Sequence, residues 1–478
     1  MIFKPFIRDY ISIQGQRVKT PRLLSIHNPW DNSICGQVPM ATVDQVQKAI
    51  AAAKNYQSNL TRFERYQICT KAAALLRARS EEIAQLITAE SGLCIKDSTY
   101  EVGRACDVFI FAGNAALQDD GQIFSCDLTA HGKKRKVYTL REPLLGVISA
   151  ITPFNHPLNQ VAHKIAPSIA TNNRMVLKPS EKTPLTAYLL QDILYEAGLP
   201  EPMFTIITGD PKEIADELLT HSDVDLVTFT GGVPIGKYIA AKAIYKRQVL
   251  ELGGNDPIIV MDDADIDEAS TLAVAGSYKN SGQRCTAIKR MLVHNRVAEL
   301  FVEQVTAKTA KIKYGNPMDP EMDMGTVIDE AAAREFEAKV NEAIDHGAIL
   351  KIGNQRTGAL FSPTVLDHVQ STMNVAFTET FGPVSPIIRF ETIDEAIPLS
   401  NSTAYGLSSS ICTNRWDYMN RFIRELKVGS VNIREVPGYR LELTPFGGIK
   451  DSGIGIKEGV QEAMKSFTNV KTYSLPWG

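Results

Sequence analysis

The chain lacks several features that would set it apart from ordinary globular proteins. Its 478 residues contain only seven cysteines, scattered and without any Cys-x-x-Cys spacing, which indicates neither a disulfide framework nor a zinc site. We therefore expect no bound metal. No apolar run is long enough to cross a bilayer, and the N-terminal residues do not form a signal peptide, so we predict a cytoplasmic chain.

The chain also has little net charge. Its 51 Lys and Arg residues nearly balance 54 Asp and Glu residues, for a formal net charge of -3. This balance gives no reason to expect nucleic acid or a membrane as a partner. The short basic run Lys133–Lys136 lies at a predicted hairpin tip, where solvated side chains are the simpler interpretation. With 44% hydrophobic residues the chain can form a large core, and we expect at least two domains.

The order of sequence patterns predicts an α/β protein. Residues 43–116 repeat Ala, Leu, Arg and Glu at helical spacing, and residues 124–141 alternate as a β-hairpin does. Short apolar runs separated by helical stretches follow, which is typical of βαβ units and parallel sheets. The predicted strands lie at 146–151, 174–179, 203–209 and 225–231, with a second set at 257–261, 291–294 and 384–390.

Cys285 is a candidate nucleophile. It lies in the turn Ser281–Thr286 (SGQRCT), directly after a predicted helix at 267–279. A reactive sulfur needs exposure and a lowered pKa, and Arg284 beside it could supply the second. The turn alone is equally compatible with a buried structural cysteine.

Glu251 is a candidate general base. It ends the apolar run that opens into Gly253 and Gly254, in the segment VLELGGND from Val249 to Asp256. A carboxylate held at a strand end can face a cleft and activate water. An ordinary charged residue at a strand edge is the alternative.

These two segments together resemble the paired signatures of the aldehyde dehydrogenase superfamily. Further segments resemble family motifs in the same order, and they span nearly the whole chain: Thr152–Leu158 (TPFNHPL), Leu177–Glu181 (LKPSE), Phe229–Gly232 (FTGG), Glu379–Pro383 (ETFGP) and Pro445–Gly453 (PFGGIKDSG).

The resemblance implies a Rossmann-like cofactor domain and an α/β catalytic domain, with a small oligomerisation element. We place the cofactor domain at 1–118 and 142–252 and the catalytic domain at 253–440. The hairpin at 119–141 and the C-terminal segment at 459–478 would form the oligomerisation element. In this family a tail such as Thr468–Tyr473 joins a neighbouring subunit's sheet, so a homodimer or homotetramer is expected.

The resemblance also implies a mechanism. Cys285 would attack an aldehyde carbonyl, while the side chain of Asn155 and the backbone N–H of Cys285 stabilise the oxyanion. Hydride transfer would leave a thioester, and Glu251 would activate the water that hydrolyses it. A relative that has lost catalysis and a CoA-acylating enzyme are the alternatives, and the presence of Glu251 favours hydrolysis by water.

The cofactor implied by the resemblance is NAD, with NADP possible. An acidic residue near the ribose hydroxyls disfavours a 2′-phosphate without excluding it. The turn at Gly232 would place a helix N-terminus at the pyrophosphate, although the family usually has serine at this position. The implied cofactor contacts are Lys178, Ser180, Glu181, Thr230, Gly231, Gly232, Gly236, Glu379 and Phe381.

Four basic residues near the motifs indicate an anionic substrate: Arg104, His156, Arg284 and Arg440. Guanidinium groups donate hydrogen bonds in a geometry that suits phosphonate and phosphate oxygens. Burying several of them without an anion would cost free energy of desolvation. The set resembles the phosphonoacetaldehyde dehydrogenase branch. Branches acting on lactaldehyde, sulfoacetaldehyde, phosphonoformaldehyde or a semialdehyde are the alternatives, and Arg104 could instead pair with Glu101 on its own helix.

Overall fold

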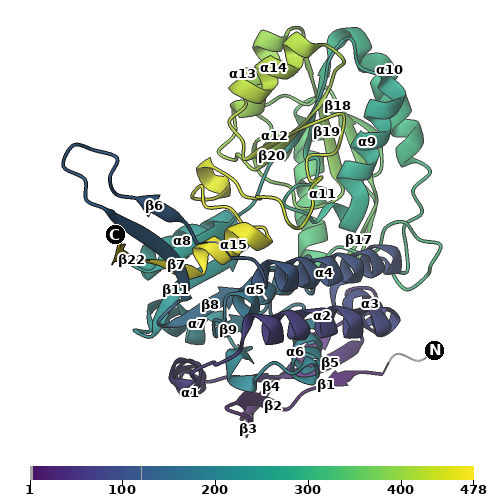
Figure 1. Ribbon diagram of the computed structural model, residues 1–478. Coiled ribbons are helices and arrows are strands. Elements are labelled where there is room, and N and C mark those ends of the chain that lie inside the picture. The colour runs from purple at the N-terminus through teal and green to yellow at the C-terminus, as the bar shows by residue number, and fades with distance from the viewer. Residues whose placement is uncertain (1–3, 120, 478) are drawn as a thin grey trace.

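Two α/β parts and a projecting arm make up the molecule (Figure 1). The structure, a computed structural model, describes residues 4–119 and 121–477. The domain limits predicted at residues 1 and 478 lie outside these ranges. The predicted fold class is confirmed, because each part is built on a mainly parallel sheet.

The lower part in Figure 1 contains a five-stranded parallel sheet in the order β10-β9-β8-β11-β12. Functional candidates follow the carboxyl ends of its strands: Lys178 ends β9, Glu251 ends β12, and Asn155 follows β8 closely. Ligands of parallel sheets bind at this edge. The strands are β8 (Val147–Ile151), β9 (Met175–Lys178), β10 (Phe204–Ile206), β11 (Val224–Thr230) and β12 (Arg247–Glu251).

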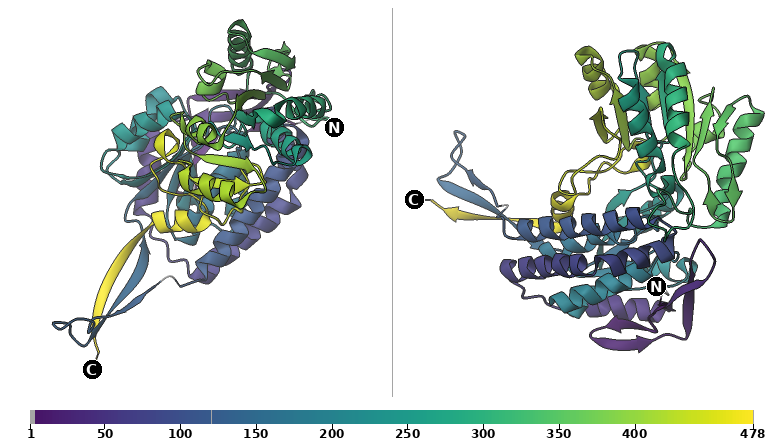
Figure 2. Two further views of the ribbon diagram at one scale, coloured as in Figure 1. Left: turned by 90° about the horizontal axis from the view of Figure 1, so that it is seen from above. Right: turned by 90° about the vertical axis from the view of Figure 1, so that its right-hand side faces the viewer.

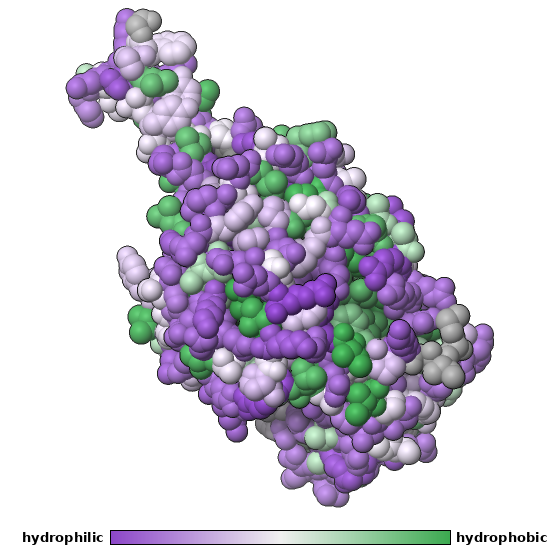
Figure 3. All heavy atoms as spheres, turned by 90° about the horizontal axis from the view of Figure 1, so that it is seen from below, coloured by the Kyte–Doolittle hydropathy of each residue, from purple (hydrophilic) through white to green (hydrophobic). Residues whose placement is uncertain are grey.

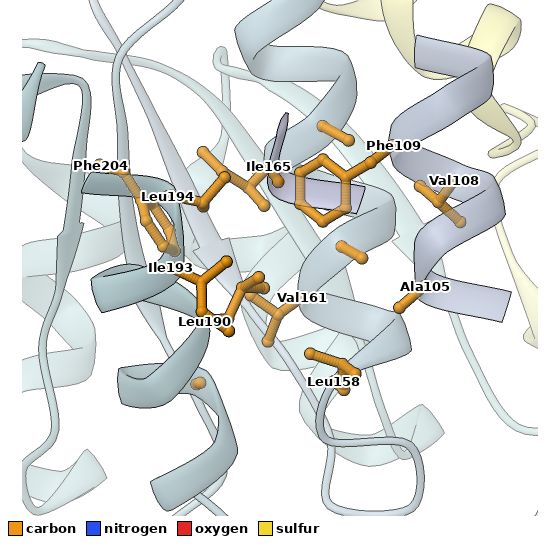
Figure 4. Packing of buried hydrophobic residues seen from close by; sticks show 14 of the residues in the cluster. Ala105, Val108, Phe109, Leu158, Val161, Ile165, Leu190, Ile193, Leu194 and Phe204 are labelled. Atoms are coloured by element: carbon orange, nitrogen blue, oxygen red, sulfur yellow. The ribbon is translucent and has the colours of Figure 1, made fainter. Parts of the chain in front are cut away.

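The helices predicted at 43–116 are confirmed as four consecutive helices: α1 (Val43–Asn55), α2 (Arg62–Ala78), α3 (Ser80–Ser91) and α4 (Ile95–Ala116). Helix α5 (Asn159–Ala170) packs between α4 and α6 (Leu185–Ala197), with Val161 and Ile165 facing Phe109 and Leu194 (Figure 4). This packing fixes the start of α5, four residues after the candidate oxyanion residue Asn155. Helices α7 (Pro211–Thr220) and α8 (Val233–Ala243) complete this part, together with strands that the sequence patterns did not predict: β1 (Phe6–Ile7), β2 (Tyr10–Ile13), β3 (Gln16–Lys19), β4 (Arg22–His27) and β5 (Ile34–Met40).

The upper part contains a seven-stranded sheet in the order β15-β18-β19-β14-β13-β20-β21, in which only β15 is antiparallel to its neighbour. The strands predicted near 257, 291 and 384 are confirmed as β13 (Pro257–Val260), β14 (Arg290–His294) and β19 (Val384–Phe390). The sequence patterns did not predict β15 (Ile349–Ile352), β18 (Thr364–Asp367), β20 (Ser408–Cys412) or β21 (Ser430–Ile433). The main helices are α9 (Ile266–Tyr278), α10 (Asn295–Thr309), α11 (Glu330–Asp345), α12 (Asn374–Phe377), α13 (Ile393–Asn401) and α14 (Trp416–Glu425), and β16 (Arg356–Thr357) pairs with β17 (Leu360–Phe361).

The arm is a three-stranded antiparallel sheet that projects from the body (Figure 2). The predicted hairpin is present as β6 (Ile123–Ser125) and β7 (Arg135–Pro143). The tail forms β22 (Thr468–Pro476), which pairs with β7 of its own chain. The rings of Tyr473 and Tyr138 stack across this pair, with their centroids 5.2 Å apart. Helix α15 (Val460–Ser466), within the predicted C-terminal element, packs instead on α5.

The described residues contain neither a membrane-spanning helix nor a disulfide. None of the helices in 4–119 and 121–477 is long and apolar enough to span a membrane. All seven cysteines are free thiols; five are buried, and Cys126 and Cys285 are partly exposed.

Candidate active site

Cys285 follows a strained turn. After α9, Asn280, Ser281 and Gly282 adopt φ of 59°, 54° and 71°, a conformation that non-glycine residues adopt only when the surroundings impose it. The Asn280 N–H donates to Asp97 Oδ2 at 2.7 Å and holds the turn against α4. A Cβ on Gly282 would come within 2.3 Å of the Gly382 carbonyl. The turn is therefore fixed by tertiary contacts, as a site that positions a nucleophile requires.

A cavity of about 500 Å³ opens beside this turn. Its lining combines residues from both α/β parts: Asn155, Glu251, Cys285, Glu379 and Phe381. The structure therefore brings the three predicted catalytic residues to one space, together with five of the predicted cofactor contacts: Thr230, Gly231, Gly232, Glu379 and Phe381.

The Cys285 thiol is not activated in the way the sequence suggested. Burial raises the pKa of Cys285 to about 11, while the charges of Lys289 and Arg440 lower it. Arg284, which the sequence pointed to, donates from Nη2 to the Gly276 carbonyl at 2.6 Å. The free protein therefore holds a thiol at neutral pH, and forming the thiolate requires a base or a change in the surrounding charges.

Two hydrogen bonds hold Asn155 against the turn that precedes Cys285. Its Nδ2 donates to the Gln283 carbonyl at 2.9 Å, two residues before Cys285, and its own carbonyl accepts from Asn280 Nδ2 at 3.0 Å. A side-chain amide has two N–H groups, so a second donor remains for a ligand. Asn155 is 4% exposed, which gives such a hydrogen bond a low-dielectric setting.

Glu251 has the surroundings of a general base. It is 3% exposed, and both carboxylate oxygens are buried without a hydrogen-bond partner. Burial raises the pKa of Glu251 well above its ordinary value, and the charge of Glu458 raises it further. Gly447 allows this placement, because a Cβ there would lie 2.3 Å from Glu251 Oε1. A carboxylate whose pKa is raised is a stronger base and can accept a proton from water.

The glycine-rich turn at the cavity begins α8, as the sequence predicted. Gly231 and Gly232 line the cavity, and Gly232 caps α8 without a side-chain hydrogen bond, so backbone N–H groups at the helix start are free for an anion. Thr230 Oγ1 is buried without a partner beside them. Gly236 has a packing role, because a Cβ would meet Leu252 Cδ2 at 2.4 Å.

The remaining predicted cofactor residues lie around the same space. Lys178 forms an ion pair with Glu181, and Ser180 Oγ accepts from the Lys182 N–H at 3.2 Å. Glu379 Oε1 accepts from the Gly254 N–H at 3.1 Å, and Phe381 packs edge-on against a neighbouring aromatic ring. Lys178, Ser180 and Glu181 do not line the cavity itself.

Arg104 and Arg440 meet at a carboxylate that the sequence did not single out. Arg104 Nε donates to Glu442 Oε1 at 2.5 Å, so its partner is Glu442 and not Glu101. Arg440 Nη2 lies 3.9 Å from Glu442 Oε2, which also contacts His163 Nε2 at 2.5 Å. Burial opposes the charged form of Glu442, yet the charges of His163, Arg104 and Arg440 hold its pKa well below its ordinary value.

His156 and Arg284 complete the basic group. His156 Nδ1 lies 3.5 Å from Glu101 Oε2, and burial lowers the pKa of His156, to which the charges of Arg104 and Arg284 add. Burial also lowers the pKa of Arg284, with a smaller contribution from Arg104. The four predicted residues therefore lie within electrostatic range of one another. None of them lines the cavity that holds the cofactor candidates, which places this basic group at a separate flank of Cys285.

Sequence reasoning missed three residues of the site: His163, Lys289 and Glu442. Lys289 Nζ donates to the Cys285 carbonyl at 2.6 Å and is 1% exposed. Only sequence spacing could have pointed to two of them. His163 lies one helical turn after Asn159, the first residue of α5, and Glu442 lies two residues after Arg440. Neither spacing reveals which charges meet.

One cavity is lined by a partly exposed cysteine, an amide donor, a buried carboxylate and a glycine-rich helix start. This set of groups is suited to covalent oxidation of a carbonyl compound. Residues 17–473 match the Aldehyde dehydrogenase family. The chain belongs to this family.

Three relatives illustrate the range of the similarity. The chain is 37% identical to a 3-sulfolactaldehyde dehydrogenase of Priestia aryabhattai, over 98% of each chain. It is 38% identical to a sulfoacetaldehyde dehydrogenase of Neptuniibacter caesariensis, covering 94% of this chain and 98% of the relative. The crystal structure of an NADP-dependent glyceraldehyde-3-phosphate dehydrogenase from Bacillus halodurans, complexed with NADP, superposes with a TM-score of 0.95 at 37% identity, covering 98% of this chain and 100% of that one.

Proposed function

We propose that the protein oxidises an aldehyde carrying a tetrahedral oxyanion to a carboxylate, with NAD or NADP as hydride acceptor. The observation that carries this proposal is the group of three largely buried arginines, Arg104, Arg284 and Arg440, on one flank of Cys285. Arg284 Nε and Arg440 Nη1 are both buried without a hydrogen-bond partner. Unpaired buried donors of this kind cost stability unless a ligand satisfies them.

The cluster is well suited to an anion. Glu442 is shared by Arg104, Arg440 and His163, so one carboxylate balances more than one cation. The unpartnered N–H groups of Arg284 and Arg440 favour an oxyanion that can accept several hydrogen bonds. Phe446, whose ring lies 3.8 Å from the Arg440 guanidinium, holds that side chain in place.

The residues would act in sequence. Cys285 Sγ attacks the aldehyde carbon as its proton passes to a base, and the new C–O⁻ is held by Asn155 Nδ2 and the Cys285 N–H. The cofactor supplies the acceptor for the hydride that leaves the same carbon. Glu251 would then take a proton from water as the water oxygen attacks the thioester carbon, after which the C–S bond breaks, Cys285 leaves as a thiolate and the acid is released.

The residues present fit a nicotinamide dinucleotide. Free N–H groups at the start of α8, the unpartnered Thr230 Oγ1 and the Glu379 carboxylate provide contacts for phosphate and ribose groups. Lys178 and Glu181 would hold the adenosine ribose. Several relatives and similar structures are named for NADP or were solved with it, and others are named for NAD or were solved with it. We therefore propose either form for this chain.

The substrate we first inferred, phosphonoacetaldehyde, is one candidate among several. The relatives reported above are named for sulfonate and phosphate aldehydes, and neither sequence relative is named for a phosphonate. Sulfonate and phosphonate groups share the tetrahedral oxygens that the arginines would bind. We propose this shared group as the feature recognised. A neutral aldehyde of lactaldehyde type is the alternative substrate.

Replacing Arg440 tests the anion site. Arg440→Ala should lower kcat/KM for sulfoacetaldehyde and phosphonoacetaldehyde about 100-fold, because a charge-assisted hydrogen bond contributes about 1.5–3 kcal/mol. Propanal, which has no anion, should change little. The matched control Arg434→Ala removes an exposed arginine paired with Glu268 and should change neither. Equal losses for all three aldehydes would rule out the anion site.

A substrate screen separates the remaining possibilities. NADH and NADPH formation at 340 nm is compared for sulfoacetaldehyde, 3-sulfolactaldehyde, phosphonoacetaldehyde, lactaldehyde and propanal, without CoA. We expect the anionic aldehydes to be preferred and the free acid to be the product. A requirement for CoA would instead indicate acyl transfer to a thiol.

We further propose that the arm and tail mediate oligomerisation. Figure 3 shows the arm standing clear of the body, with apolar residues among hydrophilic ones. Leu475→Asp should dissociate the assembly, as measured by light scattering, whereas Ser474→Asp on the opposite strand face should leave it intact. Equal masses for both variants would contradict this role. The exposed apolar residues of the arm are Ile123, Phe124, Leu128, Val470, Tyr473, Leu475 and Trp477.

A further inference from the structure

Lys289 is a buried cation at the junction of the nucleophile and the cofactor site. It lies four residues after Cys285, just before β14, and its side chain is 1% exposed. Nζ donates to the Cys285 carbonyl at 2.6 Å and lies 3.0 Å from Glu379 Oε1. A single ammonium group therefore touches the backbone of the nucleophile and the carboxylate expected to bind the cofactor ribose.

Two carboxylates, those of Glu379 and Asp256, and one aromatic ring lie close to Lys289. Asp256, held by Ser408 Oγ at 2.5 Å, is a second nearby anion, and its carbonyl accepts from the Lys289 N–H at 3.0 Å. The Phe381 ring lies 5.7 Å from Nζ and closes off water. A desolvated lysine needs such compensation to remain charged.

The close approach of these groups depends on two glycines. A Cβ on Gly253 would lie 2.1 Å from Glu379 Oε2, and one on Gly254 would lie 2.7 Å from the Cys285 carbonyl oxygen. Only Leu252 separates these glycines from the candidate base, Glu251. The glycines thus bring the cysteine turn and the Glu379 segment together around the Lys289 ammonium group.

We propose that Lys289 is a positioning residue that holds Cys285 and Glu379 in one ion-paired cluster and thereby couples occupancy of the cofactor site to the reactivity of the Cys285 thiol. The inference rests on the proposed function, which assigns Cys285 as nucleophile and Glu379 as a ribose contact. Hydrogen bonds from ribose hydroxyls to Glu379 would spread its negative charge and leave more of the Lys289 field acting on the sulfur.

Electrostatics gives this coupling a sign. The charge of Lys289 lowers the pKa of Cys285, second only to the opposing effect of burial, whereas the charge of Glu379 raises it. Removing Lys289 should therefore make the thiol less reactive at a given pH. Removing the charge of Glu379 should make it more reactive, and the two opposite shifts distinguish the cluster from a general loss of packing.

The test is the pH dependence of Cys285 alkylation by iodoacetamide, measured in a Cys126→Ala background because Cys126 is the other partly exposed thiol. Lys289→Met should slow alkylation about tenfold at pH 8, as a shift of one pKa unit requires, and Glu379→Gln should accelerate it. Lys289→Arg should restore most of the wild-type profile. Lys289→Met should also raise KM for the cofactor, and saturating NAD should accelerate alkylation in the wild type but not in this variant.

Lys308→Met is the matched control. Lys308 also makes several side-chain hydrogen bonds, but it lies on α10 and its partners are Asp267 and Ser270. It should leave the alkylation profile unchanged. The inference is wrong if Lys289→Met and Glu379→Gln both keep the wild-type pH dependence of alkylation. If Lys289→Met does not fold, an unchanged pH dependence in Glu379→Gln alone contradicts the inference. Failure of the proposed function is separate, because it would appear as a wild-type protein that oxidises none of the aldehydes.

Discussion

Cys285→Ala is expected to abolish aldehyde oxidation while leaving the fold intact. Loss of the nucleophile in an enzyme that works through a covalent intermediate costs on the order of 10⁶-fold in kcat. Alanine is smaller than cysteine, and Cys285 is partly exposed in the cavity rather than packed in a core. The measurement is steady-state NADH or NADPH formation, with the melting temperature as the check on folding.

Cys126→Ala provides the matched control for this experiment. Cys126 is the other partly exposed cysteine and lies in the arm, between β6 and β7. It should retain wild-type activity. Substantial oxidation by Cys285→Ala, or a loss of activity in Cys126→Ala, would remove Cys285 from its proposed role.

Glu251→Gln is expected to stop the reaction after the first half. Glutamine keeps the shape but cannot take a proton from water, so hydrolysis should fall about 10²- to 10⁴-fold. One equivalent of NADH or NADPH per subunit should form rapidly and then formation should almost stop. Mass spectrometry should find the acyl group on Cys285, and hydroxylamine, which attacks thioesters without a base, should release it.

Glu251 should also determine how the hydrolysis rate of the wild-type protein depends on pH. Because burial raises the pKa of Glu251, its basic form is populated only at a pH above the ordinary range of a glutamate. Hydrolysis should therefore increase with pH on the acidic side, and Glu251→Gln should lose this dependence. Glu425→Gln, an exposed carboxylate paired with Arg421, is the control and should keep the burst, the turnover and the profile. A Glu251→Gln variant that turns over normally would require another base.

Some of the fold could be predicted from local patterns. The helices of residues 43–116 repeat apolar residues at helical spacing, and β13, β14 and β19 are short apolar runs. Strand β20 was missed because Ser408, Ser409 and Ser410 do not resemble a buried apolar strand, although all three are buried in the sheet. The pairing of β22 with β7 of its own chain was also missed, because register between distant strands is not encoded in either alone.

The sequence by itself determined the family and the chemical types at the site, because Cys285, Glu251 and Asn155 stand in motifs whose order is specific. Only the tertiary structure decided how those groups are tuned. The thiol is protonated at neutral pH, Glu442 contacts two arginines and His163, and Lys289 joins Cys285 to Glu379. Burial and charge pairing depend on residues far apart in the chain, so spacing along the sequence cannot reveal them.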